Sequence, residues 1–184
     1  ASPFVRRHEV FKDIVAQVEV KWGVSPRSAM YLAAVHVLCC LNERNIESKC
    51  RVFESFGWDR SHVVHLFRLN PNCFGVGARN IKAKLSFYMN ELGYDPGRIV
   101  AYHSLLSYSL EKRVMPRHLI LQVLKEKGLI RRKRSFPVAL SLCEDKFLGK
   151  FVMPFLDVVP DLQDMYVNSI KAATKEETTL VSQE

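Results

Sequence analysis

The feature that most constrains this chain is a short glycine-containing pattern that returns about every 35 residues. It reads WGVSPRS, FGWDRSH, LGYDPGR and KGLIRRK, and in each copy an apolar residue follows the glycine. A glycine just past a helix adopts the left-handed conformation that ends the helix, and the apolar residue after it packs back on that helix. We therefore expect helix ends, 34, 36 and 35 residues apart, at Gly23, Gly57, Gly93 and Gly128.

The first three copies also carry a signal for the start of a new helix. Two residues after the glycine stands a residue that favours the N-cap position: Ser25, Asp59 or Asp95. Proline, which suits the first helical position, follows Ser25 and Asp95. Each of these copies is predicted to be a corner with a two-residue linker. The fourth copy has Ile130 in place of the cap, and we expect it to close the array.

The segments between the corners have the apolar spacing of helices. This holds for residues 60–69, 81–92 and 117–127, and the opening of the chain also reads as a helix. Further breaks are predicted at Asn70-Pro71 and at residues 102–104. A period near 35 built of helix pairs is typical of an α-solenoid, in which neighbouring units bury each other's apolar faces. Tetratricopeptide and pentatricopeptide arrays have a similar period, but the signature residues of the tetratricopeptide are missing.

Three segments resemble the mitochondrial transcription termination factor (mTERF) family, in its plant branch. They are FGWDRSHVVHLFRLNPNCF, LGYDPGRIVAYHSLLSYSLEKRVMPRHLILQVLKEKGLI and KFLGKFVMPFLDVVPDLQDMY, and the most specific part is SLEKRVMPR followed by LKEKGL. The resemblance extends from about residue 4 to residue 168, and it departs at His103, where the family usually has proline. Because family members are usually longer at the N-terminus, the chain is similar to a C-terminal portion of one.

The resemblance implies a fold and a function. The fold is an all-α, right-handed-type solenoid whose repeats each contain two α-helices and a short third helix, curved with a basic concave face that holds double-stranded DNA. The function is non-enzymatic regulation of organelle transcription and its termination, with RNA binding in intron splicing or RNA processing as the alternative. The expected location is the mitochondrion, or alternatively the chloroplast, with a transit peptide removed before residue 1. We expect a monomer, with organellar protein partners in addition to nucleic acid.

The chain divides into three parts on these patterns. Residues 1–134 are predicted to hold about four repeats, and residues 135–173 a helical cap that carries Pro137, Pro154 and Pro160 as breaks. Residues 174–184 have little apolar content, and we expect them to be disordered. A further function class is a protein-interaction scaffold, because solenoids also grip partner helices in their grooves.

The net charge of +8 is concentrated late in the chain. Residues 112–134 hold nine Lys or Arg and one acid, whereas residues 135–184 sum to −4. Arginine forks suit phosphate oxygens, and phosphate contacts supply most non-specific affinity for nucleic acid. We expect Arg113 and Arg117 to emerge at a helix junction beside the amino end of a helix that starts near Pro116. The other candidate phosphate contacts are Arg79, Lys82, Lys84, Lys112, Arg131, Arg132 and Arg134.

Other chemistry has weaker signals. Tyr88, Tyr102 and Tyr108 could stack on bases, but their spacing favours core packing. His62 and His65 lie three residues apart with Cys73 nearby, but no further ligand completes a metal site, so we expect no metal and no cofactor. Gly75-Val76-Gly77 lacks the remaining residues of a phosphate loop. The odd count of five cysteines favours free thiols, and no run of about 18 apolar residues predicts a membrane span.

Overall fold

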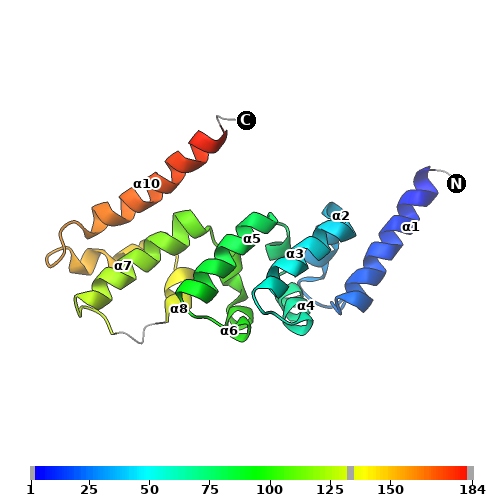
Figure 1. Cartoon of the computed structure of the whole chain (residues 1–184), viewed down its shortest axis with the longest axis horizontal. Coiled ribbons are helices and arrows are strands. Elements are labelled where there is room, and N and C mark those ends of the chain that lie inside the picture. The colour runs from blue at the N-terminus through cyan, green and yellow to red at the C-terminus, as the bar shows by residue number, and fades with distance from the viewer. Residues whose placement is uncertain (1–2, 132–134, 182–184) are drawn as a thin grey trace. The chain divides into compact units, whose positions relative to one another are not determined.

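The computed structural model describes residues 3–131 and 135–181, with side chains placed for residues 8–131 and 135–172. The described part of the chain is helical and contains no strand (Figure 1). It divides into two compact units, Ala1–Ser107 (unit 1) and Tyr108–Glu184 (unit 2).

Unit 1 contains six α-helices and four short helices of other types. The α-helices are α1 (Pro3–Ala16), α2 (Tyr31–Cys40), α3 (Glu43–Ser55), α4 (Arg60–Leu69), α5 (Ala78–Leu85) and α6 (Pro96–Ala101). Two wide π turns, η1 (Gln17–Lys21) and η3 (Ser86–Glu91), extend α1 and α5, and two 3₁₀ helices, η2 (Pro71–Phe74) and η4 (His103–Ser107), follow α4 and α6. The predicted helix 60–69 is confirmed, and both predicted breaks coincide with the starts of η2 and η4.

The four corner glycines are confirmed. Gly23, Gly57, Gly93 and Gly128 have φ of +62°, +82°, +67° and +70°, and no other described residue has a positive φ. At Gly57 and Gly128 the N–H of the next residue donates to the carbonyl five positions earlier, as in a Schellman motif. At Gly23 and Gly93 it donates to the carbonyl six positions earlier, because the preceding helix ends in a π turn.

Two of the three predicted N-caps are confirmed. Asp59 accepts a hydrogen bond from the N–H of His62 at 2.9 Å, and Asp95 accepts one from the N–H of Arg98 at 2.7 Å. The prediction for the first corner was wrong, because α2 begins at Tyr31 and not near Ser25. The hydroxyl of Ser25 instead accepts from the N–H two residues later, and its carbonyl closes a tight turn. Serine bonds of this kind favour a local turn over helix.

The destabilisation that a side chain causes at a corner can be measured at Gly57, where an added Cβ would meet no atom within 4 Å. Gly57→Ala is expected to lower the free energy of unfolding by about 1–2 kcal/mol, since only the left-handed backbone opposes it. Gly149→Ala, in α9 (Glu144–Phe151) and equally unobstructed, is the control and should stabilise by about 0.5–1 kcal/mol. Urea unfolding followed by circular dichroism measures both changes. A neutral or stabilising Gly57→Ala would contradict a conformational role for this glycine.

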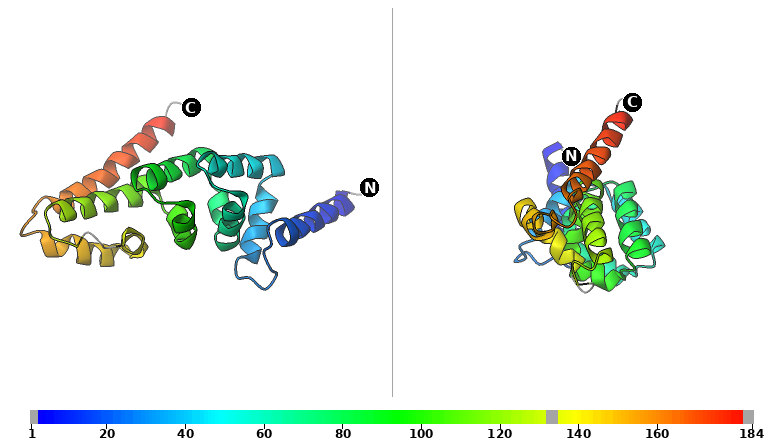
Figure 2. Two further views of the ribbon diagram at one scale, coloured as in Figure 1. Left: turned by 60° about the horizontal axis from the view of Figure 1, so that its bottom comes forward. Right: turned by 90° about the vertical axis from the view of Figure 1, so that its left-hand side faces the viewer.

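The repeat is visible within unit 1. The groups α3–α4–η2 and α5–η3–α6–η4 each contain two main helices and a short third one, as the resemblance implies. The first helix of one repeat packs on the first helix of the next, α3 on α5, and α4 packs in the same way on α6. Figure 2 shows α3 and α5 in one layer and α4 and α6 in the other. Because each repeat buries its neighbour, a side chain repeated at the same position recurs on the same face.

An aromatic cluster forms the core between the first two corners. The rings of Trp22 and Phe67 stack with centroids 4.2 Å apart, and Phe74 lies 5.3 Å from Phe67 and 5.4 Å from Phe53. Trp58, the residue after the second corner glycine, packs on Phe53 at 5.0 Å. The apolar residues after the first three corner glycines are buried, as the sequence predicts, whereas Leu129 after the fourth is half-buried.

Unit 2 is built around a long helix. The π turn η5 (Leu110–Val114) continues into α7 (Met115–Glu126), and α8 (Phe136–Ser141), α9, η6 (Met153–Phe155) and α10 (Leu162–Val181) follow. α10 packs on α7 and η5. It also runs through residues 174–181, where the sequence suggested disorder.

An α-helix begins near Pro116, at Met115, as predicted, but its amino end is not free, because the π turn η5 continues into α7. At this point the hydrogen bonding changes from the wide π turn to the α pattern. A proline, which has no N–H to offer, is tolerated there.

Candidate nucleic-acid interface

The described basic residues among those selected from the sequence fall into three environments. Four are exposed, two are buried and Arg113 is half-buried. The exposed residues are Arg79, Lys82, Lys112 and Arg131, and the buried ones are Lys84 and Arg117. Arg132 and Arg134 lie outside the described residues. Among the selected residues that the structure describes, only the four exposed ones have a side chain largely open to a ligand.

The exposed cations of unit 1 include an arginine that was missed from the sequence. Arg44 lies in the first turn of α3, 35 residues before Arg79 in the first turn of α5, and both are exposed. Because α3 and α5 pack side by side, these arginines occupy equivalent places on adjacent helices. Lys82, one turn after Arg79, is exposed as well. The 35-residue period was the signal that could have identified Arg44.

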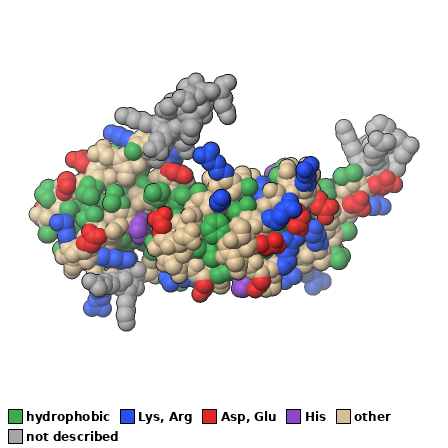
Figure 3. Space-filling view, in the orientation of Figure 1, with side chains coloured by type: hydrophobic (Ala, Val, Ile, Leu, Met, Phe, Trp, Pro, Cys, Tyr) green, Lys and Arg blue, Asp and Glu red, His purple; other side chains and the backbone are tan. Residues whose placement is uncertain are grey.

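Acidic residues near this group are largely engaged by other cations. Figure 3 shows Lys and Arg side chains over α3, interleaved with Asp and Glu. Glu43 pairs with Lys21 at 3.0 Å, and Arg60 pairs with both Glu47 and Glu54. The Arg60 guanidinium also holds the pKa of Glu47 below its ordinary value. These acids therefore offset the charge of Arg44, Arg79 and Lys82 less than their number suggests.

The buried lysines hold the backbone of their own repeat. Lys49 is 7% exposed, and its Nζ donates to the carbonyl of Phe74, the last residue of η2, at 2.7 Å. Lys84, 35 residues later and 4% exposed, donates to the carbonyl of Leu106 in η4 at 2.7 Å. Carbonyls at the end of a helix have no partner within it, and a cation placed there also interacts favourably with the helix dipole. Burial lowers the pKa of Lys49.

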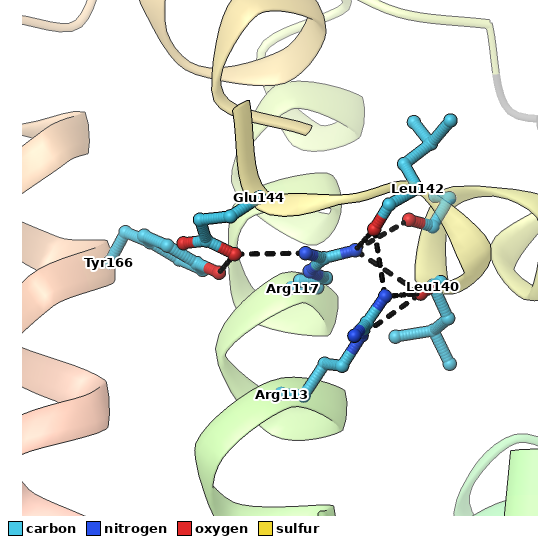
Figure 4. Close-up of polar contacts among 7 residues, drawn as sticks. Arg113, Arg117, Leu140, Leu142, Glu144 and Tyr166 are labelled. Atoms are coloured by element: carbon cyan, nitrogen blue, oxygen red, sulfur yellow. Dashed lines mark hydrogen bonds and ion pairs between the residues drawn. The ribbon is translucent and has the colours of Figure 1, made fainter. Parts of the chain in front are cut away.

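Arg117 occupies the corresponding place in unit 2. It is 1% exposed, and its Nη1 donates to the carbonyls of Ala139, Leu140 and Leu142 at 3.1, 3.2 and 2.7 Å. These carbonyls lie at the end of α8 and just after it. Figure 4 shows the guanidinium between these carbonyls on one side and Glu144 on the other. Its separation of 33 residues from Lys84 nearly continues the series.

The carboxylate of Glu144 completes this cluster. Its Oε2 lies 2.9 Å from Nη2 of Arg117 and accepts a hydrogen bond from the hydroxyl of Tyr166 at 3.2 Å. Arg117 also lies over the ring of Phe147, with Cζ 4.4 Å from the centroid. Burial is the main cause that raises the pKa of Tyr166. The cluster joins α7, α9 and α10, so the contacts of Arg117 are those of a residue that stabilises the fold.

Arg113 reaches the same carbonyls from one turn earlier. Its Nε and Nη2 donate to Leu140 at 3.0 and 2.7 Å, and Nη2 also donates to Leu142 at 2.7 Å. Its guanidinium lies 4.5 Å from the ring centroid of Tyr108. The geometry therefore gives both arginines internal partners, where the sequence suggested phosphate. A ligand contact by either would need these bonds to be exchanged.

The three tyrosines differ in what they can offer to a base. Tyr88 is fully buried, and its hydroxyl donates to the carbonyl of Leu105 at 3.0 Å. Tyr108 is half-buried beneath Arg113. Tyr102 is 40% exposed and is the only one of the three with a broad solvent-facing surface.

The described residues contain neither a cluster of side chains that could bind a metal ion nor a helix that could span a membrane. Nδ1 of His62 lies 2.9 Å from Asp59, and Cys73 is buried, which raises the pKa of its thiol. Within residues 8–131 and 135–172, no three His, Cys, Asp or Glu side chains gather in a way that could hold a metal. In the part of the chain with described structure, every helix is too short or too polar to span a bilayer.

The comparison with known families gives one result that bears on this surface. Residues 21–148 match the family model described as mTERF, and this range covers more than half of the chain. It includes the four corner glycines, the buried cations and the exposed arginines of α3 and α5. No solved structure matches the chain.

Proposed function

Because the chain belongs to the mTERF family, we propose that it acts by binding double-stranded DNA in an organelle and thereby controls transcription or its termination. The family indicates an organellar nucleic-acid-binding regulator of gene expression. We further propose the mitochondrion as its location, since the sequence resembles the mitochondrial group of the plant branch. No catalytic residue is assigned.

The observation that carries this proposal is the row of exposed cations on adjacent repeats. Arg44 and Arg79 stand in the first turns of two neighbouring helices, and Lys82 adds a third charge one turn later. The amino end of a helix favours anions, so a phosphate near either arginine would also meet a favourable helix dipole. A surface of this kind suits a backbone whose phosphates recur at short, regular intervals.

Control of transcription would follow from occupancy of the DNA. Cations that bind phosphates release condensed counterions, which supplies affinity without regard to sequence. Such contacts position the protein on the duplex, and contacts to base edges must supply any specificity. We propose that the exposed cations supply this affinity for phosphates, while Lys49 and Lys84 hold the backbone of their own repeats and Arg117 holds that of unit 2.

Removal of the exposed row should change the salt dependence of binding. Arg44→Ala/Arg79→Ala/Lys82→Ala is expected to reduce the slope of log K against log salt by about 0.9 for each duplex phosphate that these side chains neutralise. The control is Lys12→Ala/Lys127→Ala/Lys146→Ala, which removes the same charge from exposed positions elsewhere. Fluorescence anisotropy with a labelled duplex measures both slopes. Equal reductions in the two variants would mean that net charge alone matters and that α3 and α5 form no interface.

RNA is the second candidate ligand, and the exposure of Tyr102 favours it. Phosphate contacts do not distinguish the two polymers, but an unpaired base can stack on an exposed aromatic ring. Tyr102 follows α6 directly and is 40% exposed. Under this alternative, Tyr102→Ala weakens binding to single-stranded RNA and leaves duplex binding unchanged.

A further inference from the structure

Helix α8 has an apolar face that the described structure leaves open. Five of its six residues, FPVALS, are apolar, and a helix that is apolar all round is normally covered on every side. Phe136, Ala139 and Leu140 are buried, but Val138 on the same helix is 53% exposed. The open side of α8 borders a groove within unit 2.

The groove has a volume of about 220 Å³. Its lining comes from α8, α9 and the residues next to α8: Ser135, Val138, Ala139, Leu142, Lys150 and Phe151. A closed cavity of about 150 Å³ admits a benzene ring, whereas sites for drug-sized ligands begin near 300 Å³. The groove therefore suits one large apolar side chain better than a whole cofactor.

The one charged residue in the lining of the groove is positive. Lys150 lines it, with Nζ 5.8 Å from the ring centroid of Phe151. No acid is among the lining residues. Glu144, two residues after Leu142, is held by Arg117 and Tyr166. The groove thus combines an apolar floor with a cation at its edge, which complements a ligand that is apolar and acidic.

A nucleobase fits this groove less well than an aliphatic side chain does. Bases bind single-strand proteins largely by stacking on exposed aromatic faces. Phe151, the one aromatic residue of the lining, is 3% exposed and presents almost no ring surface. The remaining apolar lining is aliphatic, and a leucine-like group can pack on it without any particular ring orientation.

We propose that this groove binds an acidic amphipathic helix of a partner protein. One large apolar side chain of that helix enters the groove against Val138, Leu142 and Phe151, and an acidic residue of the helix lies near Lys150. This is the helix-in-groove mode, in which anchors spaced by three or four residues give affinity and charge gives orientation. The proposal is independent of nucleic-acid binding, because it uses none of the cations of α3 and α5.

The test uses a defined probe, a fluorescein-labelled 18-residue helical peptide with leucine at every third or fourth position and glutamate elsewhere. The same peptide with lysine in place of glutamate is the charge control. We expect the acidic peptide to bind the full chain at least tenfold more tightly than the basic one. Val138→Glu should weaken binding at least tenfold, and Lys150→Glu several-fold, with the second effect fading at high salt.

The control variant is Val20→Glu, because Val20 is 85% exposed and lies in unit 1. It should bind the acidic peptide as the unchanged chain does. Thermal unfolding checks that each variant folds. If Val138→Glu does not fold, Lys150→Glu still tests the proposal, because Lys150 is exposed. The proposal is overturned if the acidic peptide does not bind or if neither groove variant weakens it. Displacement of the bound peptide from the groove by duplex DNA or RNA would also overturn it, since the groove would then serve nucleic acid.

Discussion

Arg117→Ala is expected to lower the free energy of unfolding by about 3–5 kcal/mol, one of the two largest effects predicted for this chain. The guanidinium is 1% exposed and bonds three carbonyls and Glu144. Its removal leaves a cavity, and the carbonyl of Ala139 loses the one side-chain donor observed for it. Arg113 still bonds Leu140 and Leu142, which keeps the destabilisation from being larger. Urea unfolding followed by circular dichroism measures the change.

The control for Arg117 is Arg131→Ala in the same unit. Arg131 is exposed, and its replacement should change stability by no more than about 0.5 kcal/mol. DNA binding by the Arg117 variant must be measured where it is still folded, because unfolding alone would abolish binding. A variant with unchanged stability but no DNA affinity would support the phosphate contact that the sequence suggested and would contradict the structural role.

Phe74→Ala is expected to lower the free energy of unfolding by about 3–5 kcal/mol. Phe74 is fully buried and contacts the rings of Trp22, Phe53 and Phe67, so truncation opens a void among large, rigid groups. Its carbonyl also accepts the bond from Lys49, and a shift of the backbone would weaken that bond. The same urea experiment measures the destabilisation. Phe11→Ala, at a phenylalanine that is 50% exposed, is the control and should lie within about 0.5 kcal/mol of the unchanged chain.

The fold could be read from the sequence because its strongest signals are local. A glycine after a helix, followed by an apolar residue, determines a corner through backbone sterics alone, and all four corners have the expected positive φ. Asp59 and Asp95 cap their helices for an equally local reason. Two expectations failed because other local hydrogen bonds form. At Ser25 a serine turn replaces the expected helix start, and at Pro116 the π turn η5 leaves no free amino end.

The candidate interface was harder to predict because charge was given more weight than helical spacing. Arg117 lies three residues before Ile120 and seven before Leu124, both buried, so its position is on the apolar face of α7. Lys84 likewise lies three residues after the buried Ile81. This spacing could have marked both as internal. Their carbonyl partners, 22 to 25 residues away in the chain, could not be found without the three-dimensional arrangement.

The same logic separates the cations that remain candidates for ligand contact. Arg44 and Arg79 lie on the exposed side of their helices and repeat with the period of the fold. A repeated charge on a solenoid surface recurs on one face, whereas a repeated charge on the apolar side must find an internal acceptor. The 35-residue period and the helix face together therefore separate Lys and Arg side chains with internal partners from those open to a ligand. They do so more reliably than the local density of charge does.

The most direct test of the central claim is the binding of the unmodified chain to matched double-stranded DNA, single-stranded DNA and RNA, measured by fluorescence anisotropy at several salt concentrations. The account predicts binding to the duplex at low salt, with log K falling linearly as log salt rises. Tighter binding to RNA than to the duplex would support a nucleic-acid function but would identify RNA, and not double-stranded DNA, as the ligand. Absence of binding to all three at low salt, by a chain shown to be folded, would contradict the account.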